Sequence, residues 1–158
     1  MIRTAVPADA PALAALHLRA RATYYPEGFP DDGTDWVQAW GEAIARPRSQ
    51  ILVSVRDGAV VGLASFRTPE DEPKDVVKLF QFHVSPDHWR QGVGTELHAA
   101  CVEEWQADGF TQAWLDVHGD NQRAQAFYAR QGWADEGYGD HGGSHRRMRL
   151  RLTTRPGE

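Results

Sequence analysis

The sequence has a single cysteine, Cys101, among 158 residues. One thiol excludes an internal disulfide framework and favours a protein of the reducing cytoplasm. The sequence also lacks the roughly 18 uninterrupted apolar residues that a membrane-spanning helix needs. Its amphipathic N-terminus carries an early acid in place of the basic start and apolar block of a secretion signal. We therefore expect a cytoplasmic chain with no membrane segment.

Basic residues are outnumbered, with 17 Lys and Arg against 22 Asp and Glu, so the formal net charge is −5. This balance argues against a nucleic-acid partner and mildly favours cationic or amine-bearing partners. A chain of this length that is 41% hydrophobic and 25% charged is typical of one soluble globular domain. We expect one domain over residues 1–153 and a tail over 154–158. The seven histidines and the cysteine show no spacing typical of a zinc site, so we expect no metal.

Apolar periodicity and turn signals predict alternating helices and strands along the whole chain. Helical spacing predicts helices from Asp9 to about Ala22, from Trp36 to near Pro47, from Val93 to about Asp108, and over 121–132. Strand patterns cover 50–56, 60–67, 76–84, 112–118, a segment begun by Trp133, and 146–152. The Asp57-Gly58 pair between the first two of these predicts a β-hairpin. With a further strand at the N-terminus, from residue 2, the predicted order is βααβββαβαββ, a mixed α/β domain.

The segment HVSPDHWRQGVGTEL, residues 83–97, passes from a strand into a helix through two glycines. The N-terminus of a helix presents unpaired N–H groups and attracts anions, and Gly92 and Gly94 would let a phosphate approach the backbone. The segment lacks the Gly-Lys-Ser/Thr of a Walker loop and the third glycine of a dinucleotide fingerprint, which argues against other classes of nucleotide-binding protein. These residues alone leave two readings open, an anion site and an ordinary strand-to-helix turn.

A second motif lies about 24 residues further on. The pattern apolar-x-Val-x-Pro, polar residues, Gly-Val-Gly and Leu resembles the acyl-CoA-binding motif of the GNAT family of N-acetyltransferases. The later segment LDVHGDNQRAQAFYARQGW is similar to the second half of that family's signature. The resemblance covers nearly the full chain, with one departure, because Trp89 stands where the family usually has Arg or Gln. It implies the GNAT fold, a mostly antiparallel central sheet with flanking helices and two splayed parallel strands, 76–84 and 112–118.

The resemblance also implies a set of contacts to acetyl-CoA as co-substrate. Backbone groups of Phe82, His83 and Val84 would meet the pantetheine arm, and one of their N–H groups would polarise the thioester carbonyl. The pyrophosphate would lie on the turn that follows, whose residues are Arg90, Gln91, Gly92, Val93, Gly94 and Thr95, with Glu96 pointing outward. Asn121 would contact the pantetheine arm or cap a helix. Phe127 would contact the cofactor or fill the core.

For catalysis, the family assigns the general acid to the tyrosine that matches Tyr128, and the alternative is a packed core aromatic. Asp116 is the candidate base, since some members carry a carboxylate at this strand position, and the alternative is a solvated strand acid. His83 and His118 are the other candidates for the base, because histidine titrates near neutral pH. We expect His88 and His98 at the surface.

An aromatic wall in the acceptor site is one interpretation of Tyr24, Tyr25, Phe29 and Trp36, with acids at Glu27, Asp31, Asp32 and Asp35. The other interpretation is an acidic loop over core aromatics. The resemblance implies an N-acetyltransferase in which an amine, of a small molecule or a peptide N-terminus, attacks the thioester directly in a ternary complex. A non-catalytic acyl-CoA-binding or regulatory domain is the alternative. Homodimers are common in the family, with Trp36, Trp40 and the edge of the last strand as possible contacts.

Overall fold

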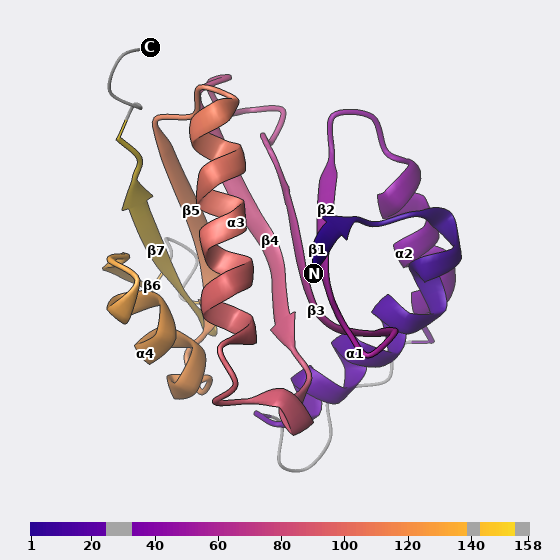
Figure 1. Ribbon diagram of the computed structural model, residues 1–158. Helices are drawn as coiled ribbons and strands as arrows, with labels where there is room; N and C mark the ends of the chain where they lie inside the picture. The colour runs from indigo at the N-terminus through magenta and orange to yellow at the C-terminus, as the bar shows by residue number, and fades with distance from the viewer. Residues whose placement is uncertain (25–32, 139–142, 154–158) are drawn as a thin grey trace. The chain divides into compact units, whose positions relative to one another are not determined.

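The computed structural model describes residues 1–24, 33–138 and 143–153 (Figure 1). Within these ranges the chain has seven strands and four α-helices in the order β1-α1-α2-β2-β3-β4-α3-β5-α4-β6-β7. This order is the predicted βααβββαβαββ, so the mixed α/β class is confirmed. Hydrogen-bonded neighbours follow the order β1-β2-β3-β4-β5-β7-β6, and β4 and β5 pair in parallel.

The chain divides into two compact units. The first unit comprises Met1–Phe66 and Gln81–Cys101, and the second comprises Arg67–Phe80 and Val102–Glu158. Strand β4 (Val76–Val84) and helix α3 (Val93–Ala107) each contribute residues to both units. That the two units act as one N-acetyltransferase domain over 1–153 stays a prediction.

In the first unit, β1 (Ile2–Thr4), β2 (Gln50–Arg56) and β3 (Ala59–Arg67) form an antiparallel ladder. The β2–β3 turn has positive φ at both Asp57 (51°) and Gly58 (78°), as a tight hairpin requires, so the Asp57-Gly58 prediction is confirmed.

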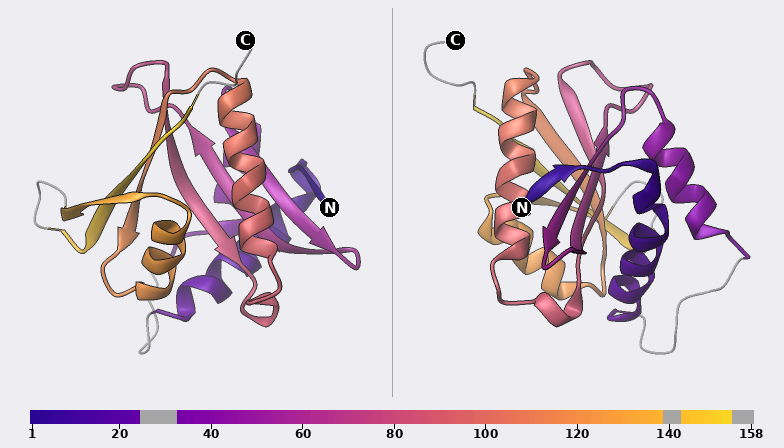
Figure 2. Two further views of the ribbon diagram at one scale, coloured as in Figure 1. Left: turned by 60° about the vertical axis from the view of Figure 1, so that its left-hand side comes forward. Right: turned by 45° about the vertical axis from the view of Figure 1, so that its right-hand side comes forward.

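Helices α1 (Ala10–Ala22) and α2 (Trp36–Ala45) lie side by side on one face of this ladder (Figures 1 and 2). Between the helices and the strands is an apolar core that includes Leu13, Trp40, Ile51, Val53 and Leu63. Trp40 is only 4% exposed, because it packs in this core. The expectation that Trp40 contacts a second copy is therefore wrong. Within the described ranges the last strand, β7 (His145–Arg151), pairs with β5 on one side and β6 on the other, so it offers no free edge for such a contact either.

The opposite face of β2 and β3 packs against the start of α3. Gly62 in β3 lies so close to α3 that an added Cβ would meet Val93 Cγ1 at 3.2 Å and Leu97 Cδ2 at 3.3 Å. Val93, Leu97 and Cys101 are at most 1% exposed, so one face of this helix is an apolar, buried stripe. The position of α3 in the first unit thus depends on a glycine that leaves room for two side chains.

The second unit is built on β5 (Gln112–His118), β7 (His145–Arg151) and β6 (Ala134–Tyr138), which pair antiparallel in that order. Alternation along β5 and β7 places the paired residues Leu115 and Met148 in the core, each 2% exposed, and leaves the paired Asp116 and Arg147 more accessible. On the core side Trp133 packs edge-on against Trp105 of α3 at 6.2 Å and lies 5.6 Å from Tyr128 of α4 (Gln122–Arg130).

The parallel pairing of β4 with β5 is short. It joins Val76–Lys78 to Gln112–Trp114 and ends there, although within the second unit β4 continues to Phe80 and β5 to His118. Beyond Lys78 in β4 and Trp114 in β5, the backbone groups of the two strands therefore do not pair with each other.

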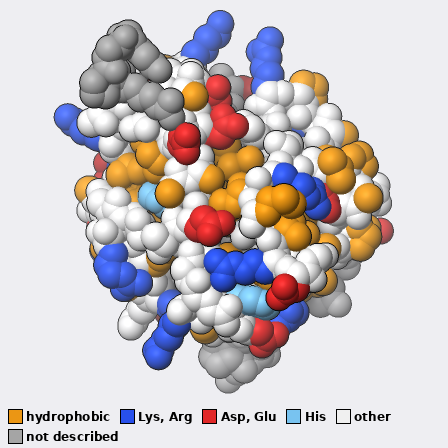
Figure 3. Space-filling view, viewed as in Figure 1, with side chains coloured by type: hydrophobic (Ala, Val, Ile, Leu, Met, Phe, Trp, Pro, Cys, Tyr) orange, Lys and Arg blue, Asp and Glu red, His pale blue; other side chains and the backbone are white. Residues whose placement is uncertain are grey.

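None of the helices in the described ranges is long and apolar enough to cross a bilayer. Figure 3 shows acidic and basic side chains interspersed on the visible face, with apolar side chains between them.

Candidate active site

In the turn between β4 and α3, residues with positive φ change the direction of the backbone. β4 ends at Val84, a 3₁₀ turn covers Pro86–His88, and α3 begins at Val93. Between them Arg90 (φ 64°) and Gly92 (φ 80°) both occupy the left-handed region. That conformation suits glycine and strains an arginine, so Arg90 marks a site where the fold holds the backbone against its local preference.

Trp89 has a structural role in this turn. Its indole Nε1 donates a hydrogen bond to the carbonyl oxygen of Val84 at 3.2 Å, which ties the turn to the end of β4. The N–H of Ser85 donates to the carbonyl of Val61 at 2.8 Å and anchors the same end to β3. With a tryptophan at this position, the cations at the turn are Arg90, whose side chain is exposed, and Arg56, whose Nη1 donates to the carbonyl oxygen of Gln91 at 3.3 Å.

The beginning of α3 has the form of an anion cradle. The N–H groups of Val93, Gly94 and Thr95 have no carbonyl one turn earlier within the helix, so they are available to a ligand. Beside Gly92 a Cβ would have no atom within 4 Å, so the backbone is open to close approach. Glu96 is half-exposed and faces Arg56 at 3.8 Å, so its charge is offset. These features fit a diphosphate.

His83 belongs to an aromatic group of the first unit whose central ring is that of His17. Its ring stacks on His17 of α1 with centroids 5.0 Å apart, and its Nε2 lies 2.7 Å from Gln81 Oε1. Burial, with His17 and Arg21 adding repulsion, lowers the pKa of His83 to about 3. His83 is therefore neutral at physiological pH, and since Nε2 donates to Gln81, its Nδ1 carries the lone pair.

Sequence reasoning missed His17, which is only 1% exposed. Trp40 Nε1 donates to His17 Nδ1 at 3.2 Å, and Trp36 meets the ring edge-on at 4.7 Å. Burial, followed by repulsion from Arg21, lowers the pKa of His17 to about 4, so it is neutral. The signal in the sequence was a polar residue within the apolar stripe of the first helix.

Tyr128 and Phe127 differ from expectation. Tyr128 is buried, at 6% exposure, whereas Phe127 is only partly buried. The Tyr128 ring packs between Trp133, at 5.6 Å, and Phe127, also at 5.6 Å. The alternative that Phe127 fills the core is therefore wrong, because Tyr128 occupies that position. Both rings belong to one aromatic group of the second unit.

Asn121 is the N-cap of α4. Its Oδ1 accepts a hydrogen bond from the N–H of Ala124 at 3.1 Å, which satisfies one of the unpaired donors at the helix start. Because the oxygen is used in this way, a contact with a ligand would fall to the Nδ2 amino group.

Asp116 faces two cations. Its Oδ2 lies 3.6 Å from Lys78 Nζ, and its Oδ1 lies 3.4 Å from Arg147 Nε. His118, the alternative base on the same strand, accepts a hydrogen bond at Nδ1 from the N–H of Asp120 and meets His145 edge-on at 5.3 Å.

The other predicted residues differ in burial and in role. The expectation that His98 lies at the surface is wrong, because it is 4% exposed. Its ring meets that of Phe82 edge-on with centroids 6.4 Å apart, and burial lowers its pKa to about 4. Asp35 caps α2 by accepting the N–H of Gln38. Several residues of the expected acceptor wall lie outside the described residues, namely Tyr25, Glu27, Phe29, Asp31 and Asp32.

The structure thus brings together two sets of predicted residues. The first unit holds Phe82–Val84 and Arg90–Thr95, and the second holds Asp116, Asn121, Phe127 and Tyr128. The described residues include no group of three or more His, Cys, Asp or Glu side chains that could hold a metal.

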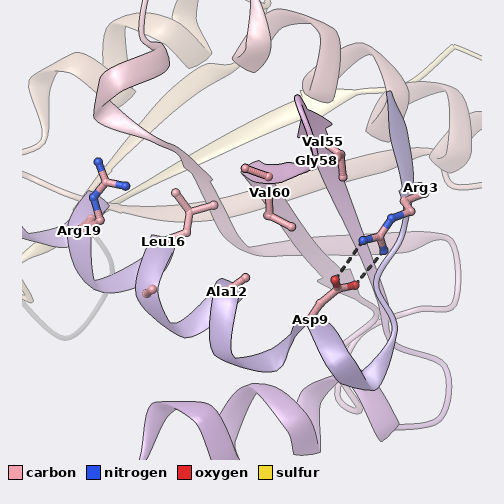
Figure 4. Close-up of a pocket in the computed structure, with 10 residues that line it drawn as sticks. Arg3, Asp9, Ala12, Leu16, Arg19, Val55, Gly58 and Val60 are labelled. Carbon is pink, nitrogen blue, oxygen red and sulfur yellow. Dashed lines mark hydrogen bonds and ion pairs between the residues drawn. The ribbon is translucent and has the colours of Figure 1, made fainter.

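A separate pocket of about 380 Å³ lies in the first unit, between α1 and the β2–β3 hairpin (Figure 4). An ion pair between Arg3 and Asp9, 2.8 Å long, closes one side. The hydrogen bonds that Arg3 donates to the Asp9 carboxylate lower the pKa of Asp9. The predicted site residues do not line the pocket, so we assign it no part in the candidate site.

The acetyltransferase family known as GNAT matches residues 13–133 of this sequence. The chain belongs to the GNAT family. The matched range contains the β4–α3 turn, Asn121 and Tyr128.

Relatives of this GNAT chain are N-acetyltransferases. An uncharacterized N-acetyltransferase of Mycobacterium tuberculosis is 30% identical over 139 residues, which cover 82% of this chain and 85% of the relative. The alanine N-acetyltransferase of ribosomal protein bS18 from Escherichia coli is 36% identical over 59 residues, 37% of this chain and 40% of that enzyme.

Solved structures share the GNAT fold. A PaiA N-acetyltransferase of Thermoplasma acidophilum, in complex with coenzyme A, matches with a TM-score of 0.79 at 16% identity, covering 96% of this chain and 98% of its own. The ribosomal-protein-S18-alanine N-acetyltransferase of Escherichia coli matches with a TM-score of 0.75 at 22% identity, covering 99% and 96%. The predicted family, fold and enzyme class are confirmed.

Proposed function

We propose that this GNAT enzyme transfers the acetyl group of acetyl-CoA to a primary amine by direct attack within a ternary complex. The observation that carries the proposal is the β4–α3 turn, where the open backbone at Gly92 adjoins the unpaired N–H groups of the first turn of α3. A diphosphate needs donors at close range, and this turn offers them without side chains in the way.

The residues of the turn and of β4 bind and orient the co-substrate in this proposal. Backbone N–H groups of Gln91–Thr95 hold the diphosphate, with Arg90 adding charge at the rim. Phe82–Val84 present backbone groups to the pantetheine arm. The carbonyl of Val84 already accepts from Trp89, so the contacts of this segment fall to its other backbone groups. Asn121 donates through Nδ2.

Tyr128 is proposed as the general acid. When the amine nitrogen forms its bond to the acetyl carbon and the carbon–sulfur bond breaks, the Tyr128 hydroxyl supplies a proton to the departing sulfur. Burial against Trp133 and Phe127 restricts the ring, which suits a group that must act from a fixed position.

The ammonium form of the acceptor must lose a proton before attack. Asp116 remains the proposed proton acceptor, although its two ion pairs mean that an amine would compete with Lys78 and Arg147 for its oxygens. His83, with a pKa of about 3, is a weak base at neutral pH. We propose instead that the lone pair on its Nδ1 accepts a hydrogen bond from the neutral amine and thereby orients that amine.

For the acceptor, the relatives named as alanine N-acetyltransferases of a ribosomal protein support a peptide N-terminus as the first candidate. We also propose a cytoplasmic location, in keeping with the single free cysteine, Cys101.

The test is thiol release from acetyl-CoA with a panel of amines that includes peptides with free N-termini, polyamines, aminoglycosides and amino acids. Tyr128→Phe should bind CoA normally and lose about 100-fold in turnover, since general acid–base catalysis contributes ~10²–10⁴. Unchanged turnover in this variant would remove Tyr128 from the mechanism. CoA binding without thiol release with any amine would instead favour a non-catalytic acyl-CoA-binding domain.

A further inference from the structure

The second unit gathers more positive charge on one surface than its acids offset. Lys78 Nζ lies 4.5 Å from the ring centre of Trp114 and 4.6 Å from that of Phe80. Arg147 Cζ lies 4.0 Å above Trp114, and Arg67 Cζ lies 4.4 Å above Phe80. Three cations therefore surround two aromatic rings, and we call this group the basic–aromatic surface.

A single carboxylate accompanies these cations. Asp116 forms the only ion pairs that Lys78 and Arg147 make with described residues, at 3.6 Å and 3.4 Å, and Arg67 makes none in this part of the chain. Three positive charges less one negative charge leave an excess of two. The sign is opposite to the formal charge of −5 on the whole chain.

Neighbouring arginines on the same strand show a different pattern. Arg149 donates to Glu136 at 3.0 Å and to Gln112 at 2.8 Å, and Arg146 donates to Asp135 at 2.9 Å. These guanidinium groups each have a carboxylate of their own. Arg146 and Arg149 thus differ from Arg147, whose carboxylate partner Asp116 is shared with Lys78.

The surface is also partly desolvated. The side chain of Lys78 is 21% exposed and that of Arg147 is 39% exposed. Trp114, 6% exposed, has a buried Nε1–H with no hydrogen-bond partner among the described residues. Cations and N–H donors that have lost their hydration cost free energy unless another group accepts hydrogen bonds from them.

We propose that the basic–aromatic surface binds a carboxylate of the amine acceptor, so that the preferred acceptors are acidic peptides or acidic amino acids. The inference rests on the proposed function, because it concerns the acceptor of that reaction.

The donors available here define the ligand chemistry. An ammonium and two guanidinium groups offer hydrogens and no lone pairs, so the ligand must supply acceptor atoms and negative charge. The planar fork of a guanidinium matches the two oxygens of a carboxylate. A polyamine brings neither acceptors nor negative charge, and it would be repelled.

The experiment uses matched acceptors that differ in one carboxylate. Peptides with a free N-terminal alanine carry Glu or Gln at the second, third or fourth position, and free glutamate is paired with glutamine. For at least one pair, kcat/KM with the acidic member should exceed that with the amide about tenfold, which corresponds to ~1.4 kcal/mol. Lys78→Gln and Arg147→Gln should each remove most of this preference.

Arg149→Gln is the matched control, because it removes the same charge from the same strand where Glu136 already offsets it. This variant should keep the preference for acidic acceptors. Thermal unfolding of each variant checks the fold, and Lys78→Gln provides an independent result if Arg147→Gln is unstable.

Equal kcat/KM within every pair would overturn the inference, as would a preference that survives in both Lys78→Gln and Arg147→Gln. A preference that phosphoserine peptides share, with the same loss in the variants, would overturn the assignment to carboxylates. Failure of the proposed function has a different signature, because the protein would then take up no CoA and release no thiol with any acceptor.

Discussion

Replacing Gly62 by alanine is expected to destabilise the first unit and to weaken CoA binding. The new Cβ would lie 3.2 Å from Val93 Cγ1, 3.3 Å from Leu97 Cδ2 and 3.4 Å from Ser54 Cβ. The nearest contacts are tighter than van der Waals separation, and all three neighbours are at most 1% exposed. The strain therefore cannot be relieved by movement into solvent.

Two opposing effects set the magnitude. Overpacking of a core costs about 1–3 kcal/mol, whereas loss of glycine's freedom in the unfolded chain stabilises by about 0.4–1 kcal/mol. The net destabilisation should be about 1 kcal/mol, which lowers Tm by roughly 2–4 °C in a chain of this size. Because Val93 is the first residue of α3, its displacement also moves the N–H groups of the proposed diphosphate cradle.

Thermal unfolding and calorimetric titration with CoA measure both effects. Gly41→Ala is the control, since Gly41 lies within α2 with no atom within 4 Å of an added Cβ. There alanine should stabilise by about 0.5–1 kcal/mol and leave CoA affinity unchanged. A Gly62→Ala protein as stable as the wild type, with the same CoA affinity, would refute the packing argument.

Further predictions concern titration and capping. His98 has a folded pKa of about 4 against an ordinary value of 6.5, so between these values the unfolded chain binds a proton that the folded chain does not. Its contribution to stability is thus complete above pH 6.5 and is lost as the pH falls toward 4, by about 2 kcal/mol at pH 5. Urea unfolding of His98→Gln should show a correspondingly shallower loss between pH 7 and 5, and an unchanged slope would contradict the assignment. Asn121→Asp should keep the cap of α4 and its stability but weaken CoA binding through loss of Nδ2, whereas Asn121→Ala should also lose about 1 kcal/mol of stability. CoA affinity that is equal in wild type and Asn121→Asp would limit Asn121 to capping.

Local patterns predicted most of the fold. Strands 50–56, 76–84 and 112–118 have the expected bounds, because apolar alternation and nearby turn residues define them within a few positions. The Gly-x-Gly turn and the later Asn-to-Tyr helix were also visible, since each needs particular residues at fixed spacing.

Predictions failed where distant segments decide the outcome. Helical spacing alone could not choose which of the adjacent aromatics Phe127 and Tyr128 is buried, because that choice depends on Trp133. The prediction for His98 failed for the same reason, since its burial depends on contacts with other segments, among them the ring of Phe82 from β4. The cations around Asp116 follow from the register of β5 against β7, which the sequence of either strand does not contain.

The central claim, that the backbone turn before α3 binds the diphosphate of CoA, is tested most directly by calorimetric titration of CoA into wild type, Gly92→Ala and Gly58→Ala. Both glycines have φ near 80° and open space beside them, so alanine strains both turns alike, but Gly58 lies in the β2–β3 hairpin. We predict that wild type and Gly58→Ala bind CoA equally well and that Gly92→Ala binds at least about tenfold more weakly, a loss of ~1.4 kcal/mol. Absence of any CoA binding, or equal affinity in the two variants, would contradict the claim.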